Sequence, residues 1–112
     1  MANPANTLGE TLTRLFETIE ARRGTSAEAS YTASLLAAGN ARCAKKFGEE
    51  AVEAALAGAA GDKAELTGEA ADVLYHLMVL MASVGVAPEA VAAELSQRES
   101  QSGHAEKAAR KP

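Results

Sequence analysis

The sequence has few of the residues that build covalent frameworks or large cores. Its 112 residues include 1 cysteine, 3 prolines, 2 tyrosines, 2 phenylalanines and no tryptophan. Because Cys43 stands alone, an internal disulfide, a zinc ribbon and CxxC redox chemistry are excluded. The longest strongly apolar run, residues 73–86, contains His76 and is too short to span a bilayer. The first seven residues also lack the basic and apolar regions of a secretory signal, so we expect a cytoplasmic protein with no membrane segment.

The sequence also has fewer basic than acidic residues. The chain has 11 Lys and Arg residues against 15 Asp and Glu residues, which gives a formal net charge of -4 at pH 7. Nonspecific nucleic-acid binding depends on cations that neutralise phosphates, so this balance argues against a nucleic-acid binder. A ligand rich in phosphate would need a metal ion to screen its charge.

Alanine is abundant, and it supplies about half of the 47% of residues that are hydrophobic. Alanine favours helices and lets them pack closely, whereas a sheet protein would need more β-branched and aromatic residues. The length fits a single domain over residues 1–112, with a polar C-terminal arm from about residue 100. Because large core side chains are few, we expect an all-α bundle of four to five helices that is completed by dimerisation.

Apolar spacing and stop signals indicate where the helices lie. The pattern predicts helices over about residues 8–23, 31–38, 40–60, 63–84 and 88–97. Ser30 and Asp62 are suited to cap the second and fourth of these helices, and Pro88 suits the first turn of the last one. Gly39 and Gly85 are expected stops.

Two of the predicted helices carry groups of acids. Glu49, Glu50 and Glu53 fall within an arc of about 100° on one helix. Glu69 and Asp72 lie on the next helix, where its apolar run begins. The connection is short, so these helices should be antiparallel neighbours whose acidic faces can meet. Converging carboxylates would suit a hard cation, Mg²⁺ or Mn²⁺, better than zinc.

The same residues have plainer interpretations. The acids of the first group can form a solvated face on which neighbouring lysines pair with Glu49 and Glu50. His76 follows Asp72 by four residues, so it is either a hydrogen-bonded core histidine or a partner that orients Asp72. From the residues alone, both pairs of alternatives stay open.

Basic residues occur in two groups, one just before the acidic face and one near the C-terminus. Surface solubility explains most such groups, and phosphate binding beside a metal is the alternative. The candidates for phosphate contacts are Lys46, Arg98, Lys107 and Arg110.

Two strings carry a resemblance to a known family. KFGEEAVE at residues 46–53, followed by EAADVLYHL at residues 69–77, resembles phosphoribosyl-ATP pyrophosphatase of histidine biosynthesis. The likeness goes beyond the acidic pair shared by the wider all-α, MazG-like NTP pyrophosphatases. It extends to LFETIEARR at residues 15–23, SYTASLLAAG at residues 30–39, and a Ser-Gly-x-x-Glu-Lys segment at residues 102–107.

The resemblance implies an all-α homodimer that uses Mg²⁺ to hydrolyse the α,β-phosphoanhydride of phosphoribosyl-ATP, giving phosphoribosyl-AMP and pyrophosphate. One carboxylate, with Glu49 and Glu50 as the candidates, would orient or deprotonate the attacking water. The family pattern assigns the metal to the acidic motif: Glu49, Glu50, Glu53, Glu69 and Asp72.

Two other functions are compatible with the sequence. A pyrophosphatase that removes non-canonical nucleotides would share the acidic motifs, although it should lack the Ser-Tyr-Thr and Ser-Gly-x-x-Glu-Lys segments. A non-catalytic helical dimerisation module would have acids that are merely solvated, and Mg²⁺ would then stabilise it little.

Overall fold

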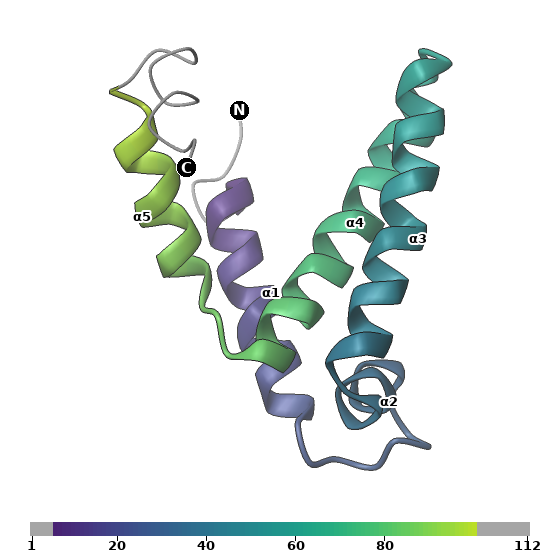
Figure 1. The fold of residues 1–112 in the computed structure, drawn as a ribbon, viewed down its shortest axis with the longest axis vertical. Coiled ribbons are helices and arrows are strands. Elements are labelled where there is room, and N and C mark those ends of the chain that lie inside the picture. The colour runs from purple at the N-terminus through teal and green to yellow at the C-terminus, as the bar shows by residue number, and fades with distance from the viewer. Residues whose placement is uncertain (1–5, 101–112) are drawn as a thin grey trace, which may run out of the picture.

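The computed structural model describes residues 6–100, and this part of the chain forms five α-helices and no strand (Figure 1). In chain order they are α1 (Leu8–Arg22), α2 (Tyr31–Ala38), α3 (Asn40–Ala59), α4 (Lys63–Val84) and α5 (Pro88–Arg98). The all-α class is confirmed, and each predicted helix end lies within about one residue of the observed one.

Side-chain caps explain where three of the helices begin. The Ser30 hydroxyl accepts a hydrogen bond from the Ala33 N–H at 3.1 Å, and the Asp62 carboxylate accepts one from the Glu65 N–H at 2.9 Å. Thr7 caps α1 in the same way. These bonds satisfy N–H groups that have no partner inside the helix, so the two N-caps predicted from the sequence are confirmed.

Two glycines end helices in backbone conformations that other residues avoid. Gly85 ends α4 with φ 93° and ψ 31°, in the left-handed region. Gly39, with φ 98° and ψ 177°, is both the C-cap of α2 and the N-cap of α3. A side chain would strain the backbone at either position. The corner between α2 and α3 therefore depends on a single residue.

The helices are arranged as a V with two unequal arms (Figure 1). Helices α3 and α4 pack against each other as an antiparallel hairpin, which forms one arm. The lower part of α4 packs on α1, and α5 turns back and packs against α1 to form the other arm. Helix α2 lies at the foot of the hairpin, where it contacts α3, α4 and α1.

The hydrophobic core lies where α1, α2, α3 and α4 meet. Most of its buried side chains come from α4, and the full cluster is Ile19, Leu35, Cys43, Met78, Val79, Met81 and Ala82. The Cys43 thiol is 1% exposed and donates to the Leu35 carbonyl oxygen at 3.2 Å. Helix α5 contributes no buried residue. Four of the five helices thus form the core, and α5 lies outside it.

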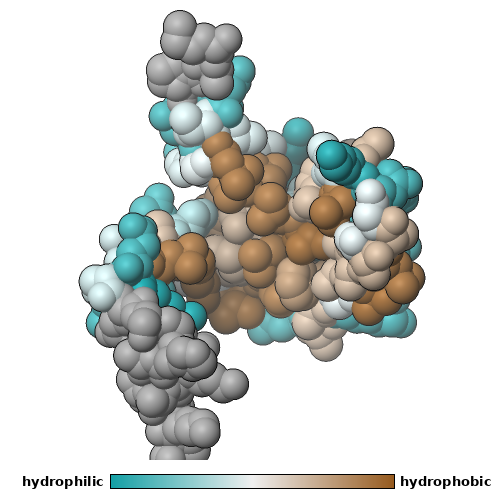
Figure 2. All heavy atoms as spheres, turned by 90° about the horizontal axis from the view of Figure 1, so that it is seen from above, coloured by the Kyte–Doolittle hydropathy of each residue, from teal (hydrophilic) through white to brown (hydrophobic). Residues whose placement is uncertain are grey.

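Several large apolar side chains stay exposed on both arms. They include Val52 and Leu56 on α3, Leu66 on α4, and Val91 and Leu95 on α5. Figure 2 looks into the open side of the V and shows apolar side chains gathered there.

The longest apolar run of the sequence, residues 73–86, is largely covered by its own chain. Met78, Val79 and Met81 are buried among the other helices, and Val84 and Val86 are the large apolar residues of this segment that remain exposed.

Within residues 6–100, no helix by itself has the length and apolar content to cross a membrane. Helices α4 and α5 meet that criterion only as a pair, and the chain bends by 111° between them.

Candidate functional site

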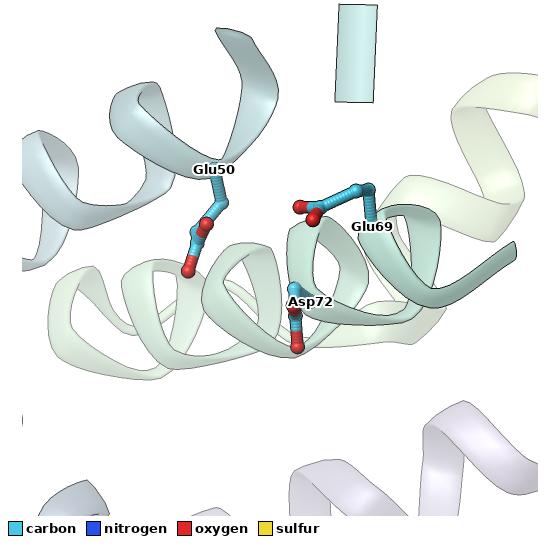
Figure 3. A group of neighbouring side chains, drawn as sticks. All are labelled: Glu50, Glu69 and Asp72. Atoms are coloured by element: carbon cyan, nitrogen blue, oxygen red, sulfur yellow. The ribbon is translucent and has the colours of Figure 1, made fainter. Parts of the chain in front are cut away.

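The α3–α4 hairpin brings together acids that are distant in the sequence. Glu50, Glu69 and Asp72 each place one carboxylate oxygen so that the three oxygens lie within 4.8 Å of one another. Glu50 comes from α3, and Glu69 and Asp72 come from α4, with Glu69 pointing toward Glu50 (Figure 3). Because Glu69 and Asp72 are three residues apart, they share one face of α4. The predicted meeting of the two acidic faces is confirmed for these three residues, which we call the carboxylate cluster.

One oxygen of this cluster lacks a partner. Glu50 and Glu69 are partly buried, and Asp72 is exposed. The Glu69 Oε2 atom is shielded from solvent and has no hydrogen-bond donor within the described part of the chain. A carboxylate oxygen withdrawn from water without a donor is unfavourable, and a cation would supply the missing interaction. The geometry and the chemistry of these oxygens therefore fit a divalent cation.

The crowding of acids also changes how readily they ionise. The pKa of Glu50 is raised, first by a hydrogen bond with the Glu53 carboxyl and then by partial burial. The pKa of Glu69 is raised, first by partial burial and then by the charges of Glu53 and Glu65. A raised pKa means that the surroundings disfavour the ionised form. A bound cation would reverse that preference, because it favours the carboxylate.

The other two acids of α3 lie beside the carboxylate cluster. Glu49 forms an ion pair with Lys46, with 3.3 Å between Nζ and Oε1, and a hydrogen bond to Glu49 is the main reason that the pKa of Lys46 is raised. Glu53 is exposed, yet its carboxyl reaches Glu50. The ion-pair interpretation therefore holds for Glu49 and Lys46. Metal binding by Glu49 and Glu53 stays a prediction.

His76 forms its hydrogen bond with the backbone carbonyl of Asp72 rather than with the Asp72 carboxylate. The histidine is 6% exposed, with Nδ1 2.9 Å from the Asp72 carbonyl oxygen and Nε2 3.1 Å from the Tyr31 hydroxyl. A carbonyl can only accept, so Nδ1 donates to it, and in the tautomer that carries its proton on Nδ1 the Nε2 atom accepts from the Tyr31 hydroxyl. The hydrogen-bonded core histidine is thus the better of the two interpretations.

An aromatic cluster that the sequence did not predict surrounds this histidine. The rings of Tyr31 and Tyr75 stack with centroids 6.3 Å apart and an interplanar angle of 22°. The Tyr75 ring also lies edge-on to His76. The Tyr75 hydroxyl forms a hydrogen bond with the Thr32 hydroxyl. One signal was available, since both tyrosines of an aromatic-poor chain fall in the segments that carry the family resemblance.

The predicted phosphate contacts are not all in one place. Lys46 is one helical turn before Glu50 on α3, next to the carboxylate cluster. Arg98 lies at the end of α5, where its guanidinium is 3.2 Å from the Glu94 carboxylate. Lys107 and Arg110 lie outside the described residues.

Comparison with known proteins gives one consistent result. Residues 12–99 match the family model described as phosphoribosyl-ATP pyrophosphohydrolase. The chain is 58% identical over 102 residues to a phosphoribosyl-ATP pyrophosphatase of Methylobacterium radiotolerans, covering 91% of this chain and 95% of that protein. It is 57% identical over 99 residues to the same-named protein of Dinoroseobacter shibae, covering 88% and 97%. A third relative, from Azospirillum brasilense, is 54% identical over 100 residues, covering 89% and 90%.

Proposed function

Because the chain belongs to the phosphoribosyl-ATP pyrophosphohydrolase family, we propose that it hydrolyses phosphoribosyl-ATP to phosphoribosyl-AMP and pyrophosphate, the second step of histidine biosynthesis. The observation that carries the proposal is the carboxylate cluster of Glu50, Glu69 and Asp72. It lies within the segment that matches the family model, and its oxygens suit the divalent cation that phosphoanhydride hydrolysis uses.

The resident cation is proposed to be Mg²⁺, with Mn²⁺ as an alternative of similar ligand preference. Glu50, Glu69 and Asp72 would hold it, and Glu49 and Glu53 are the further acids that the family pattern assigns to it. The unpartnered Oε2 of Glu69 supports this assignment. When bound, the cation supplies screening of the phosphate charges and activation of water.

The protein's own acids and one lysine supply the remaining chemistry. Glu50 and Glu49 are the candidates to orient or deprotonate the water that cleaves the α,β-phosphoanhydride. Position favours Glu50 of the two, because Glu50 lies with Glu69 and Asp72 in the carboxylate cluster whereas Glu49 is paired with Lys46. The Lys46 ammonium, held beside the cluster by Glu49, is suited to bind a phosphate oxygen. Arg98, Lys107 and Arg110 remain candidates for further phosphate contacts.

We also propose that the enzyme is a homodimer of single-domain chains. The exposed apolar side chains on both arms of the V support this, because a second copy could cover them (Figure 2). Helix α5 has no buried residue of its own, which is typical of an element that a partner completes. Sedimentation equilibrium at micromolar concentration would show species of twice 11.5 kDa, and a purely monomeric chain would contradict the proposal.

The decisive experiment is an assay of pyrophosphate release by the purified chain. We expect release from phosphoribosyl-ATP that needs added Mg²⁺ and stops with a chelator, and little release from ATP. Equal activity on ATP or on non-canonical nucleoside triphosphates would favour the alternative of a nucleotide-cleansing pyrophosphatase. Thermal melts with and without Mg²⁺ provide a second readout, because a cation that binds only the folded chain raises its melting temperature.

A further inference from the structure

The aromatic cluster next to the carboxylates has no part in the chemistry described so far. The chain has 2 tyrosines, 2 phenylalanines and no tryptophan, yet both tyrosines lie in this one place. Tyr75 is partly buried, whereas Tyr31 is 53% exposed. A large exposed aromatic side chain in so aromatic-poor a chain calls for an explanation.

The Tyr31 ring is held in place although it is exposed. Its hydroxyl donates to Nε2 of the buried His76 at 3.1 Å, and its ring stacks on Tyr75. Tyr75 is itself fixed by its hydrogen bond to Thr32. A surface tyrosine without such contacts changes rotamer freely and loses entropy when it binds a ligand. Tyr31 has already lost most of that freedom, so it offers a preorganised aromatic surface.

This surface is close to the carboxylate cluster. His76, which holds the Tyr31 hydroxyl, is one helical turn beyond Asp72 on α4. On α3, Lys46 is one turn before Glu50, and after its bond to Glu49 the electrostatic effect of Tyr31 is the next cause of its raised pKa. The Tyr31 hydroxyl is therefore hydrogen-bonded to a residue one helical turn from Asp72, and Tyr31 is near enough to Lys46 to act on its charge.

We propose that Tyr31 contacts the substrate directly, with its exposed ring stacked on the adenine ring of the nucleotide while the phosphates lie at the carboxylate cluster. The inference rests on the proposed function, since it takes a nucleotide as the ligand. Carboxylates, a cation and Lys46 account for binding of phosphates but offer nothing to a base. A fixed aromatic face is the group that binds a base through stacking.

Two variants separate the ring from its hydroxyl. Tyr31→Phe and Tyr31→Leu both lose the hydrogen bond to His76, so any loss of stability from that bond is common to both. Only Tyr31→Leu loses the aromatic face. We expect Tyr31→Leu to raise KM for phosphoribosyl-ATP about tenfold, as the loss of one base-stacking contact does, with a much smaller change in kcat. Tyr31→Phe should keep KM within about threefold of the wild-type value.

A second readout does not depend on hydrolysis. In a Tyr75→Phe chain, Tyr31 is the only tyrosine and no tryptophan is present, so intrinsic emission reports on Tyr31 alone. Adenosine monophosphate with Mg²⁺ should quench this emission, because a stacked base is in direct contact with the ring. Ribose 5-phosphate, which has a phosphate and a sugar but no base, is the matched ligand and should leave the emission unchanged.

The outcomes distinguish this inference from the function on which it rests. The base contact would be overturned by equal KM values for Tyr31→Leu and Tyr31→Phe, or by equal quenching by the two ligands. Normal turnover in the same experiments would leave the proposed function intact. Dissociation of the dimer by Tyr31→Leu alone would assign the ring to the subunit interface and also overturn it. Quenching by adenosine monophosphate alone, in a chain that does not hydrolyse phosphoribosyl-ATP, would support the base contact and refute the proposed function.

Discussion

The α3–α4 hairpin and helix α5 differ in how much of their surface the chain itself covers. The hairpin buries Cys43 and Ala57 on α3 and five residues on α4, and it positions the carboxylate cluster through contacts within one chain. Helix α5 begins at Pro88 without a side-chain cap, packs on α1 and buries nothing. The acids are therefore placed by the fold of one chain, whereas α5 has an exposed apolar face that the proposed second copy would cover.

This difference predicts how the two regions respond to change. Substitutions in the hairpin should act on chemistry or on folding whatever the oligomeric state. Changes in α5 and in the arm after it should act through assembly or substrate binding and leave the folded core intact. Substitutions in the two regions test that separation.

Glu50→Gln should lower kcat by about 100-fold or more, because it removes a charged ligand of the proposed cation and a candidate base. Its metal-free melting temperature should hold or rise, since the change also removes repulsion between Glu50 and Glu53. Steady-state kinetics at saturating Mg²⁺ and a thermal melt in chelator measure the two effects. Glu17→Gln, an exposed acid on α1, is the control and should change neither. Near-normal turnover of Glu50→Gln would show that Glu50 is neither a ligand of the cation nor the base.

Val79→Ala and Leu95→Lys compare the core with α5 directly. Val79 is 1% exposed, so its truncation should lower the free energy of unfolding by about 2 kcal/mol. Leu95 is 58% exposed, so a lysine there should leave the melt of the monomer unchanged but weaken the dimer. Denaturant unfolding and sedimentation equilibrium measure these two quantities. If Leu95→Lys left the dimer intact, α5 would not be part of the interface.

Removal of residues 102–112 should lower kcat/KM for phosphoribosyl-ATP by more than tenfold, or about 1.4 kcal/mol of transition-state stabilisation. The removed segment is polar and carries Lys107, Arg110 and Lys111, which suit an anionic ligand better than a core. The melting temperature and the oligomeric state should change little. A truncated chain with full kcat/KM would show that these cations serve solubility, and one that dissociates would assign the segment to the dimer.

The smallest effect concerns pH in the absence of metal. The pKa values of Glu50 and Glu69 are raised above the ordinary carboxyl value of 4.5, so the folded chain holds these protons more tightly than the unfolded chain does. Stability from this source is fully present below the ordinary value of 4.5 and is lost as pH rises through the raised values. Glu69→Gln should flatten this part of the pH dependence. Saturating Mg²⁺ should reverse its sign, because a bound cation favours the ionised carboxylates of the folded chain. Melts across this pH range, in chelator and in Mg²⁺, provide the measurement.

Local signals in the sequence were enough to predict the helices. Ser30 and Asp62 cap the helices that follow them, and Gly39 and Gly85 end the helices before them, because each acts on its immediate neighbours. The short connection between α3 and α4 also made their antiparallel contact predictable. Local chemistry and a short loop thus gave most of the fold.

The details of the site were harder to predict, because they depend on how side chains meet across helices. Periodicity put Glu49, Glu50 and Glu53 on one face, but it could not tell which would reach α4 and which would pair with Lys46. The contact of Tyr31 with His76 joins residues 45 positions apart, and no spacing rule covers that distance. The arrangement of partners had to come from the structure.

The single buried thiol has a practical consequence for measuring how two copies meet. Cys43 is the only cysteine of the chain and is 1% exposed, so thiol-reactive spectroscopic labels should not reach it in the folded protein. A cysteine introduced at an exposed position outside the proposed interface, such as Glu17, would therefore take up the label alone, with no need to remove the native one first. The distance between the labels on two chains would then report their relative placement in solution.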